Sequence, residues 1–450
     1  MDYFEFAARY PDFAIEAKLA KRRMEEVSHA VRQASSRDRR RILLRRLLLE
    51  DFSTRLHFAF EGVRRAERLA SYEPREISRI ATELNVYAPL CEPVETCVIR
   101  RGSRSRRIFS FRPRSRARQL LVAEAIKAIH APFPNQFTVD GGVPAALDAV
   151  EQGVRDGFVF GRELDIRDFY PSVQLGHLVS VLHPLPRAVV ENTVWMGDAV
   201  PLEGPDLFLH GVDADGPLPV RGLRGLPQGS ACSPIAAERL VADVIRELPT
   251  GVRVITYADN IMLLSETKDG VEQATTALAA ELEARSAGSL TLKAPYGEIY
   301  DARIETVRFL GREGEVYHKA GETGIDWPPN YFVLNQIFEL IEEPSTPSDL
   351  LRTQIRRVEK WGRTYPRWMR GAEHRLRLLA QLKAKQAYLS GRVERSVLVG
   401  EIERHWRALG SASPLDELLP EPPLGSATSR DDLAGLITQR RARIQSHRLS

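Results

Sequence analysis

Two aspartates in the sequence stand where an apolar run stops. Asp165 ends the apolar run in ELDIRDFYPSV, and Asp259 lies between the two apolar runs of VRVITYADNIML. A carboxylate at the end of a strand is held rigidly at the edge of a sheet, where it faces solvent. A hairpin with one acid at its tip, beside a strand that ends in another acid, can bind two divalent cations for in-line phosphoryl transfer. Either aspartate alone is also an ordinary turn residue.

The order of motifs along the chain narrows this interpretation. An arginine-rich hairpin is followed by LDIRDFYPSV, RGLPQGSACSPIAAERL, ITYADNIML, LTLKAP and VRFLG. This succession resembles the reverse transcriptase family, in particular its bacterial members from retrons, group II introns and phage defence, and most of all the defence-associated Abi/DRT type. The resemblance implies an α+β right-hand polymerase, with fingers, a palm built on an antiparallel sheet, and a helical thumb.

The resemblance implies a metal site on the two acids. Asp165 and Asp259 match the family's metal-binding catalytic carboxylates, and the backbone carbonyl of Ile166 is a further ligand. Mg²⁺ is the implied ion, with Mn²⁺ as an alternative, because oxygen ligands suit both. The family's hairpin tip is Tyr-Ala-Asp-Asp, whereas Asn260 replaces the second acid of this catalytic motif. Asparagine keeps an oxygen but loses a negative charge, so a catalytically silent protein is a competing hypothesis.

Other residues match the family's nucleotide site. Tyr170 matches the aromatic steric gate beneath the sugar, which favours deoxynucleotides, although it could also be a core tyrosine. Gln228 and Gly229 belong to the loop that touches the nascent base pair, where glycine lets the backbone approach closely. Lys293 in LTLKAP matches a candidate catalytic acid for the departing pyrophosphate, or is a surface lysine.

The stretch from residue 97 to 123 holds nine arginines and no acid. Because solvated charge runs usually mix both signs, this stretch predicts a polyanion partner. By the resemblance, Arg106 is the best match to the triphosphate-binding arginine, with Arg100 or Arg101 as a second. The predicted thumb contains IRRVEKWGRTYPRWMRGAEHRLRLL, in which Trp361, Tyr365 and Trp368 alternate with arginines. This pattern indicates either a surface that stacks on nucleic acid or a helix pair that buries its aromatics. The residues predicted to bind nucleic acid are Arg112, Arg114, Arg116, Arg363 and Arg367.

Periodicity predicts the elements that position these residues. Apolar residues at helical spacing predict basic amphipathic helices up to about residue 75, and a Gly-Ser-Arg-Ser turn between VIR and RIFSF predicts a hairpin. Further helices are expected at 117–131, 233–248 and 271–286, two strands at 252–265, and short strands near 290–317. The predicted domains are a helical basic extension at 1–75, fingers at 76–157, palm at 158–318, thumb at 319–410, and a linker with a basic helix at 411–450.

Composition restricts the class of protein further. The 450 residues are 43% hydrophobic and 28% charged, which is ordinary for a globular chain and excludes a disordered or collagenous one. Three cysteines without a CxxC pair predict neither a disulfide framework nor a zinc cluster. No apolar run predicts a membrane span or a signal peptide, so we expect a cytoplasmic location.

The net charge is +4, yet 55 of the 64 basic residues are arginines. Nucleic-acid binding or a genome rich in G and C explains that bias.

These features together predict an RNA-directed DNA polymerase, a nucleotidyltransferase that extends a primer hydroxyl with dNTPs by two-metal-ion catalysis. Its expected partners are dNTPs, an RNA template and the DNA product. A dedicated noncoding RNA is one candidate template, and further copies of the chain or other defence proteins are candidate oligomer partners. The lack of nuclease, zinc-finger and retron Val-Thr-Gly motifs favours antiphage defence over a mobile element. Template-independent or self-primed synthesis at the same site, and a catalytically silent RNA-binding scaffold, are the alternatives.

Overall fold

The computed structural model describes residues 3–66, 69–89, 92–101, 104–130, 133–196, 201–203, 207–208, 225–285, 290–319 and 322–327, together with Leu382. The chain divides into two compact units. The first comprises Met1–Gly311 and Glu315–Ile325, and the second comprises Arg312–Gly314 and Asp326–Ser450. Almost all described residues belong to the first unit. Nearly all of the predicted thumb and the whole C-terminal segment, with Arg363 and Arg367, lie outside the described residues.

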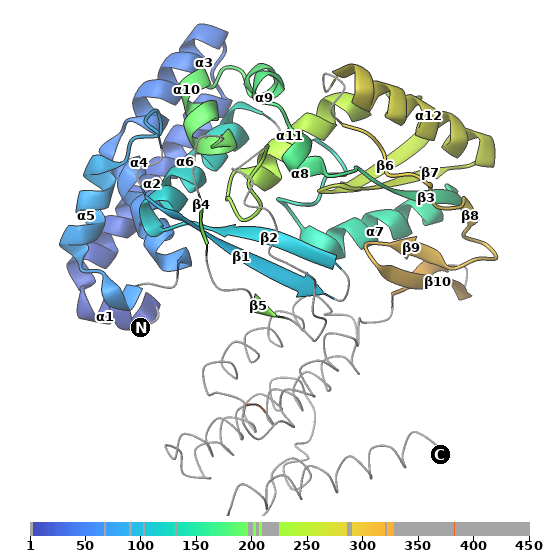
Figure 1. Cartoon of the computed structure of the whole chain (residues 1–450), viewed down its shortest axis with the longest axis horizontal. Coiled ribbons are helices and arrows are strands. Elements are labelled where there is room, and N and C mark those ends of the chain that lie inside the picture. Colours follow the sequence, from blue (N-terminus) through green and yellow to red (C-terminus); the bar gives the residue numbers. More distant parts are fainter. Residues whose placement is uncertain are drawn as a thin grey trace, which may run out of the picture. The chain divides into compact units, whose positions relative to one another are not determined.

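The N-terminal part of the first unit is helical, as the sequence predicts (Figure 1). Polar residues begin two of the helices, since the side chains of Ser36 and Asp51 accept hydrogen bonds from the N–H groups of Arg39 and Thr54, at 3.2 and 3.0 Å. The elements are α1 (Tyr3–Arg9), α2 (Pro11–Arg32), α3 (Arg37–Leu43), its π-helical continuation η1 (Leu44–Leu49), α4 (Phe52–Arg65), the 3-10 turn η2 (Leu69–Ser71) and α5 (Pro74–Glu83).

Helix α6 (Pro113–Ile129) is the centre of this helical layer. Helices α2 and α4 pack on it, and most of its side chains are buried. Gly62 of α4 lies so close to α6 that a Cβ there would stand 2.5 Å from the carbonyl oxygen of Pro113. Arg118 of α6 is buried and donates to the backbone carbonyls of Ala88, Pro89 and Asn192. The helices before residue 75 therefore share one hydrophobic core with the segment that follows them.

The arginine-rich hairpin predicted from the sequence is present. Its strands β1 (Val94–Arg101) and β2 (Arg104–Ser110) pair antiparallel. Two short strands, β4 (Pro201–Glu203) and β5 (Leu207–Phe208), pair parallel with β1 and widen the hairpin into a sheet (Figure 1).

A second, antiparallel sheet carries both aspartates. Its strand order is β6 (Val252–Tyr257), β7 (Asn260–Ser265), β3 (Phe160–Asp165) and β8 (Tyr300–Asp301). The helices of this region are α7 (Gly142–Arg155), α8 (Phe169–Ser172), α9 (Leu175–Val181), α10 (Arg187–Val189), the π-helix η3 (Val190–Trp195), α11 (Ser233–Ile245) and α12 (Lys268–Arg285).

Helices α12 and α7 cover opposite faces of this sheet (Figure 1). Arg162 of β3 reaches α12, where its guanidinium donates to both carboxylate oxygens of Glu272 at 3.0 Å. Leu263 lies opposite Arg162 in the register and shares that face. Side chains alternate along a strand, so Leu264 points to the other face, where it contacts Gly153 of α7. Burial on both faces explains why β7 is a continuous apolar run.

The predicted α+β class with antiparallel sheets is confirmed for the described residues. A three-stranded sheet in the order β11 (Glu322–Asp326), β10 (Arg312–Lys319), β9 (Val307–Phe309) accounts for part of the short strands expected near 290–317. The helix expected from residue 117 begins at Pro113, because proline is favourable in the first turn of a helix. No helix in the described part of the chain is long and apolar enough to cross a bilayer.

Gly62→Ala tests the close approach of α4 and α6. This change normally stabilises a helix by up to about 1 kcal/mol, but here the new methyl group meets the Pro113 carbonyl at 2.5 Å. We expect the free energy of unfolding to fall by about 1–3 kcal/mol, as overpacking does, and Tm to fall with it. Gly176→Ala in α9 is the matched control, since nothing lies within 4 Å of its Cβ position. Its Tm should be unchanged or raised, and an equal fall in both variants would contradict the packing.

Candidate active site

The two aspartates are brought together by the pairing of β3 with β7. Asp165, the last residue of β3, lies opposite Asn260, the first residue of β7. One residue further on, the N–H of Ile166 donates to the carbonyl oxygen of Asp259 at 2.9 Å. The two acid-bearing segments are therefore joined backbone to backbone, and the sheet sets the positions from which both carboxylates project.

Asp259 lies in a two-residue turn between Tyr257 and Asn260, the paired ends of β6 and β7. Ala258, the first turn residue, has a φ of +56°, in the left-handed region that two-residue hairpin turns require. The side-chain amide of Asn260 donates to Asp259 Oδ1 at 3.3 Å and to the Tyr257 carbonyl oxygen at 3.5 Å. Asn260 stands at the position of the second aspartate in the Tyr-Ala-Asp-Asp motif, and here it donates a hydrogen bond to the carboxylate of Asp259.

The segment after α12 pairs with the other side of Asp165. Ile166 forms an antiparallel bridge with Leu292, and the N–H of Lys293 donates to the carbonyl oxygen of Asp165 at 2.8 Å. Lys293 Nζ stands 3.9 Å from Asp165 Oδ2, with side-chain exposures of 57% and 42%. The lysine predicted to donate a proton therefore lies beside a predicted metal ligand, at a position open to solvent.

The donors of this site fit a divalent cation that is bound by oxygen. They comprise the partly buried carboxylates of Asp165 and Asp259 and the carbonyl of Ile166, which accepts no backbone hydrogen bond from the described residues. Such hard donors suit Mg²⁺ or Mn²⁺. The described residues hold no cluster of three or more His, Cys, Asp or Glu side chains that could bind a metal. A metal site here would therefore combine two carboxylates with a backbone oxygen and water.

The predicted nucleotide loop, which contains Gln228 and Gly229, is attached to strand β2. The N–H of Phe109 donates to the carbonyl oxygen of Gln228 at 2.8 Å. Gly229 has a φ of +106°, and a Cβ there would stand 2.2 Å from the Phe109 carbonyl oxygen. Glycine satisfies both requirements. On its other side the loop is tied to the start of α11, because Ser233 Oγ donates to the Pro227 carbonyl oxygen at 2.8 Å.

Tyr170 lies next to this loop. Its carbonyl oxygen accepts a hydrogen bond from the N–H of Leu226 at 2.7 Å. Gly225 approaches the same oxygen so closely that a Cβ would stand 1.9 Å from it. The Tyr170 ring is partly buried and meets Phe169 edge-on, with ring centroids 5.6 Å apart. Tyr170 is thereby placed between the end of the acid-bearing strand and the nucleotide loop.

The predicted triphosphate-binding arginines lie on the β1–β2 hairpin. Across its register Arg100 pairs with Ser105, Ile99 pairs with Arg106, and Arg101 ends strand β1. The backbone brings these three arginines to the same end of the hairpin, and their side chains are outside the described part of the structure.

Acids from distant segments accompany the acid-free arginine stretch. Arg112 lies 3.4 Å from Glu95 Oε1, and Arg114 forms an ion pair with Glu83. Arg116 is partly buried, and burial together with a neighbouring arginine lowers its pKa. Acidic side chains from other segments therefore lie beside this arginine stretch, although none occurs within it in the sequence. The Arg112–Glu95 pair is exposed, so Arg112 stays accessible to solvent.

Glu163 is a residue of this region that sequence analysis did not identify. It lies two residues before Asp165, on the same face of β3. Its Oε1 accepts a hydrogen bond from the N–H of Leu310 at 2.8 Å, which joins β3 to the turn between β9 and β10. Burial and the negative charge of Asp165 raise the pKa of Glu163, although the hydrogen bond from Leu310 lowers it. Strand alternation could have indicated this residue, but not its partner.

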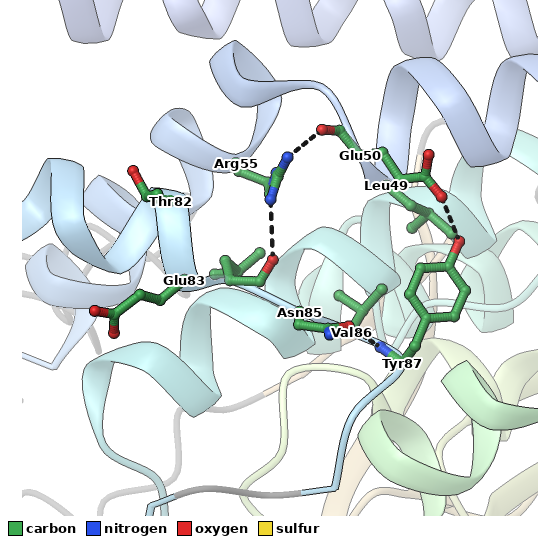
Figure 2. A pocket seen from close by; sticks show the side chains of 9 residues that line it. Leu49, Glu50, Arg55, Thr82, Glu83, Asn85, Val86 and Tyr87 are labelled. Atoms are coloured by element: carbon green, nitrogen blue, oxygen red, sulfur yellow. Dashed lines mark hydrogen bonds between the residues drawn. The ribbon is translucent and has the colours of Figure 1, made fainter.

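A polar pocket of about 370 Å³ lies among the N-terminal helices and contains none of the predicted site residues. Arg55 donates to the carbonyl oxygens of Leu84 and Glu50, and the Tyr87 hydroxyl donates to Glu50 Oε1 at 3.4 Å. Arg55, Glu50 and Tyr87 thus belong to one hydrogen-bonded group (Figure 2). The lining residues are Leu49, Glu50, Arg55, Thr82, Glu83, Leu84, Asn85, Val86 and Tyr87.

Residues 114–291, about two fifths of the chain, match the family model described as reverse transcriptase (RNA-dependent DNA polymerase). The chain therefore carries a reverse transcriptase domain, and the enzyme class that this indicates is an RNA-directed DNA polymerase, a nucleotidyltransferase. Domains of this family generally use divalent metal ions, and they imply nucleotide substrates, an RNA template and a DNA product. A search of curated proteins gives no match to the chain.

The family match confirms the resemblance to reverse transcriptases, whereas the defence-associated Abi/DRT type stays a prediction, and the match supports a polymerase fold with palm and fingers. The matched segment includes both aspartates, Tyr170 and the nucleotide loop. Lys293 and the hairpin arginines fall outside it.

Gly229→Ala tests the contact between the nucleotide loop and β2. A methyl group at a φ of +106° would meet the Phe109 carbonyl at 2.2 Å, so the loop must move. We expect KM for dNTPs to rise about tenfold. Gly157→Ala is the matched control, since its φ is +94° but nothing lies within 4 Å of its Cβ position. Both variants should lose about 1–2 kcal/mol of stability from backbone strain, and steady-state incorporation should be altered in Gly229→Ala alone. Equal kinetics in the two would contradict the assignment of the loop.

Proposed function

We propose that this domain extends the 3′-hydroxyl of a primer with dNTPs by two-metal-ion catalysis at Asp165 and Asp259. The hydrogen bond from the Ile166 N–H to the Asp259 carbonyl oxygen carries the proposal, because it fixes the two acid-bearing segments side by side. A catalytic site depends on such rigid support, since a misplacement of about 1 Å can cost about 100-fold in rate.

The reaction itself is a displacement at phosphorus. The 3′-hydroxyl gives its proton to water and its oxygen attacks the α-phosphorus of the dNTP. A new P–O bond forms, the bond between the α-phosphorus and the oxygen that bridges to the β-phosphate breaks, and pyrophosphate leaves. Asp165, Asp259 and the Ile166 carbonyl would hold the divalent cations, which would supply charge stabilisation to the attacking and leaving oxygens. Lys293 Nζ, close to Asp165, is placed to give a proton to the departing pyrophosphate.

The nucleotide is proposed to bind between the hairpin and the loop at Gln228. The hydrogen bond from Phe109 to Gln228 supports this arrangement, since it joins the two elements directly. A ring beneath the sugar would exclude a 2′-hydroxyl and so favour deoxynucleotides. The proposed contacts are Arg100, Arg101 and Arg106 to the triphosphate, Gln228 and Gly229 to the nascent base pair, and Tyr170 beneath the sugar.

The proposed nucleic-acid partners are an RNA template and the DNA product. Exposed arginines on α3 and η1 support a polyanion partner, since they form no ion pair with other described residues and unpaired arginines bind phosphate. These arginines are Arg37, Arg39, Arg41 and Arg46. The sequence adds Arg112, Arg114, Arg116, Arg363 and Arg367, of which Arg112 and Arg114 would exchange their partners Glu95 and Glu83 for phosphate.

We also propose a role in bacterial antiphage defence, in the cytoplasm. The order of the motifs and the lack of nuclease or zinc-finger motifs support this role. A dedicated noncoding RNA is the proposed template, and further copies or other defence proteins are the proposed oligomer partners.

Asp165→Asn and Asp259→Asn test the proposed site directly. Purified protein is incubated with Mg²⁺, labelled dNTPs and a primed RNA template, and we expect either change to lower kcat more than about 100-fold, or about 2.7 kcal/mol in the barrier. Fold and RNA affinity should be unchanged, because both side chains lie at strand ends, outside the hydrophobic core. Asp156→Asn is the control, an exposed acid paired with Arg253 at 2.7 Å.

Retention of a tenth of the activity in Asp259→Asn would contradict the assignment. A parallel reaction on protein freed of RNA by RNase separates the modes of synthesis. Product formed there would indicate template-independent or self-primed synthesis.

Asn260→Asp tests the amide at the hairpin tip. The new carboxylate would stand beside Asp259 Oδ1 and lose both hydrogen bonds that the amide donates. Like charges repel, so Tm without metal should fall, while the added charge binds a cation more tightly. The Mg²⁺ concentration for half-maximal activity should therefore fall with little change in maximal rate. Incorporation by Asn260→Asp but not by the wild type, at any Mg²⁺ or Mn²⁺ concentration, would indicate a silent scaffold.

A further inference from the structure

The turn that carries Asp259 has a support that lies outside the sequence motifs. The segment 135–138, between α6 and α7, runs along the edge of β6. The N–H of Thr256 donates to the Asn135 carbonyl oxygen at 2.9 Å, and the N–H of Phe137 donates to the Thr256 carbonyl oxygen at 3.1 Å. Gln136 and Thr256 form a parallel bridge. The segment therefore adds a short edge to the sheet and leads to the catalytic turn.

Thr138 extends this contact with its side chain. Its Oγ1 accepts a hydrogen bond from the N–H of Ala258 at 2.6 Å. Ala258 directly precedes Asp259 and is the turn residue with a φ of +56°. A residue other than glycine stays in that region only when its surroundings hold it there. The Thr138 hydroxyl is thus a fixed acceptor for the strained residue of the turn.

Glu238 of α11 holds the segment around Thr138. Its Oε1 accepts from the N–H of Val139 at 2.9 Å, and its backbone carbonyl accepts from the Gln136 side chain at 2.8 Å. The residue whose hydroxyl accepts from Ala258 is therefore held on both sides by α11.

Helix α11 links this segment to the nucleotide loop. The helix begins at Ser233, whose hydroxyl donates to the Pro227 carbonyl oxygen at 2.8 Å, and Glu238 lies further along the same helix. One helix thus contacts both the loop predicted to touch the nucleotide and the segment that supports the turn predicted to hold the metal.

We propose that Thr138 is a positioning residue, whose hydroxyl, carried on a segment that Glu238 holds, sets the position of the turn that carries Asp259 and couples it to α11. Thr138 acts through Asp259 and needs no contact with substrate. The inference rests on the function proposed for Asp259, but the hydrogen bonds that it concerns are present without substrate.

The test compares three variants of the full chain. Thr138→Val keeps the shape of the side chain and removes the hydroxyl, whereas Thr138→Ser keeps the hydroxyl. Thr276→Val is the matched control, since its exposed hydroxyl on α12 donates to the carbonyl oxygen of Glu272 at 3.0 Å. Two measurements are made, the hydrogen-exchange rate of the Ala258 amide without substrate, and steady-state dNTP incorporation on a primed RNA template.

In Thr138→Val we expect the Ala258 amide to exchange about tenfold faster and kcat to fall about tenfold, which corresponds to about 1.4 kcal/mol. KM for the primed template should stay within about twofold, because the template contacts are not changed. Thr138→Ser should stay within about twofold of the wild type in both measurements, and Thr276→Val should match the wild type.

A fourth variant tests the role of Glu238. Glu238→Gln keeps an acceptor for the Val139 N–H, but a neutral amide oxygen accepts more weakly than a carboxylate, so kcat should fall by about threefold. If Glu238 acts through Thr138, Thr138→Val combined with Glu238→Gln should be no slower than Thr138→Val alone. Multiplying losses would overturn this coupling.

Each remaining outcome decides the proposal. Equal losses in Thr138→Val and Thr138→Ser would assign the effect to packing and overturn it, as would wild-type exchange at Ala258 in Thr138→Val. If Thr138→Val does not fold, unchanged exchange at Ala258 in Glu238→Gln overturns it. If even the wild type incorporates no dNTP, the proposed function fails, while amide exchange still decides whether Thr138 holds the turn.

Discussion

The register between β3 and β7 is the constraint on which the site depends. The Ile166 N–H can reach the Asp259 carbonyl only while Asp165 stays opposite Asn260. A slip of one residue would turn every side chain of the strand to the other face. Arg162 makes that slip costly, because its buried guanidinium would leave Glu272 and enter the apolar face against α7. The pair with Glu272 therefore fixes the register as well as the packing of α12.

The nucleotide loop is held from three sides, and each contact uses backbone. Strand β2 binds it through Phe109, α11 through Ser233, and α6 through Gln119, whose Oε1 accepts from the N–H of Ala231 at 3.1 Å. Side chains contribute only where the loop joins helices. This explains why the loop needs glycine at residue 229, where another backbone segment lies against it, and why the predicted nucleotide and metal sites share one support.

Local patterns in the sequence predict much of this site, and long-range contacts account for what they miss. The Ala-Asp turn and its two apolar strands follow from periodicity, and the order of motifs indicates that the strand of Asp165 joins them. The ion pair of Arg114 with Glu83 joins residues 31 apart, so no local pattern contains it. The sequence predicts that Asn260 keeps a side-chain oxygen where the family has an acid. In the structure its side-chain nitrogen, not that oxygen, faces Asp259, and the conformation of the turn sets this orientation. Thr138 lies in a connecting segment with no periodicity, and only the parallel contact with β6 brings it to Ala258.

The segment that the family model matches begins at residue 114, inside the first turn of α6. Ala117, Leu121 and Ala125 of that helix are fully buried, and α2 and α4, which pack on it, precede the match. The unit that sequence comparison detects is therefore smaller than the unit that folds. A fragment cut at residue 114 would expose a continuous apolar stripe and aggregate or recruit another covering surface. Exchange of this domain between genes would have to carry the preceding helices with it.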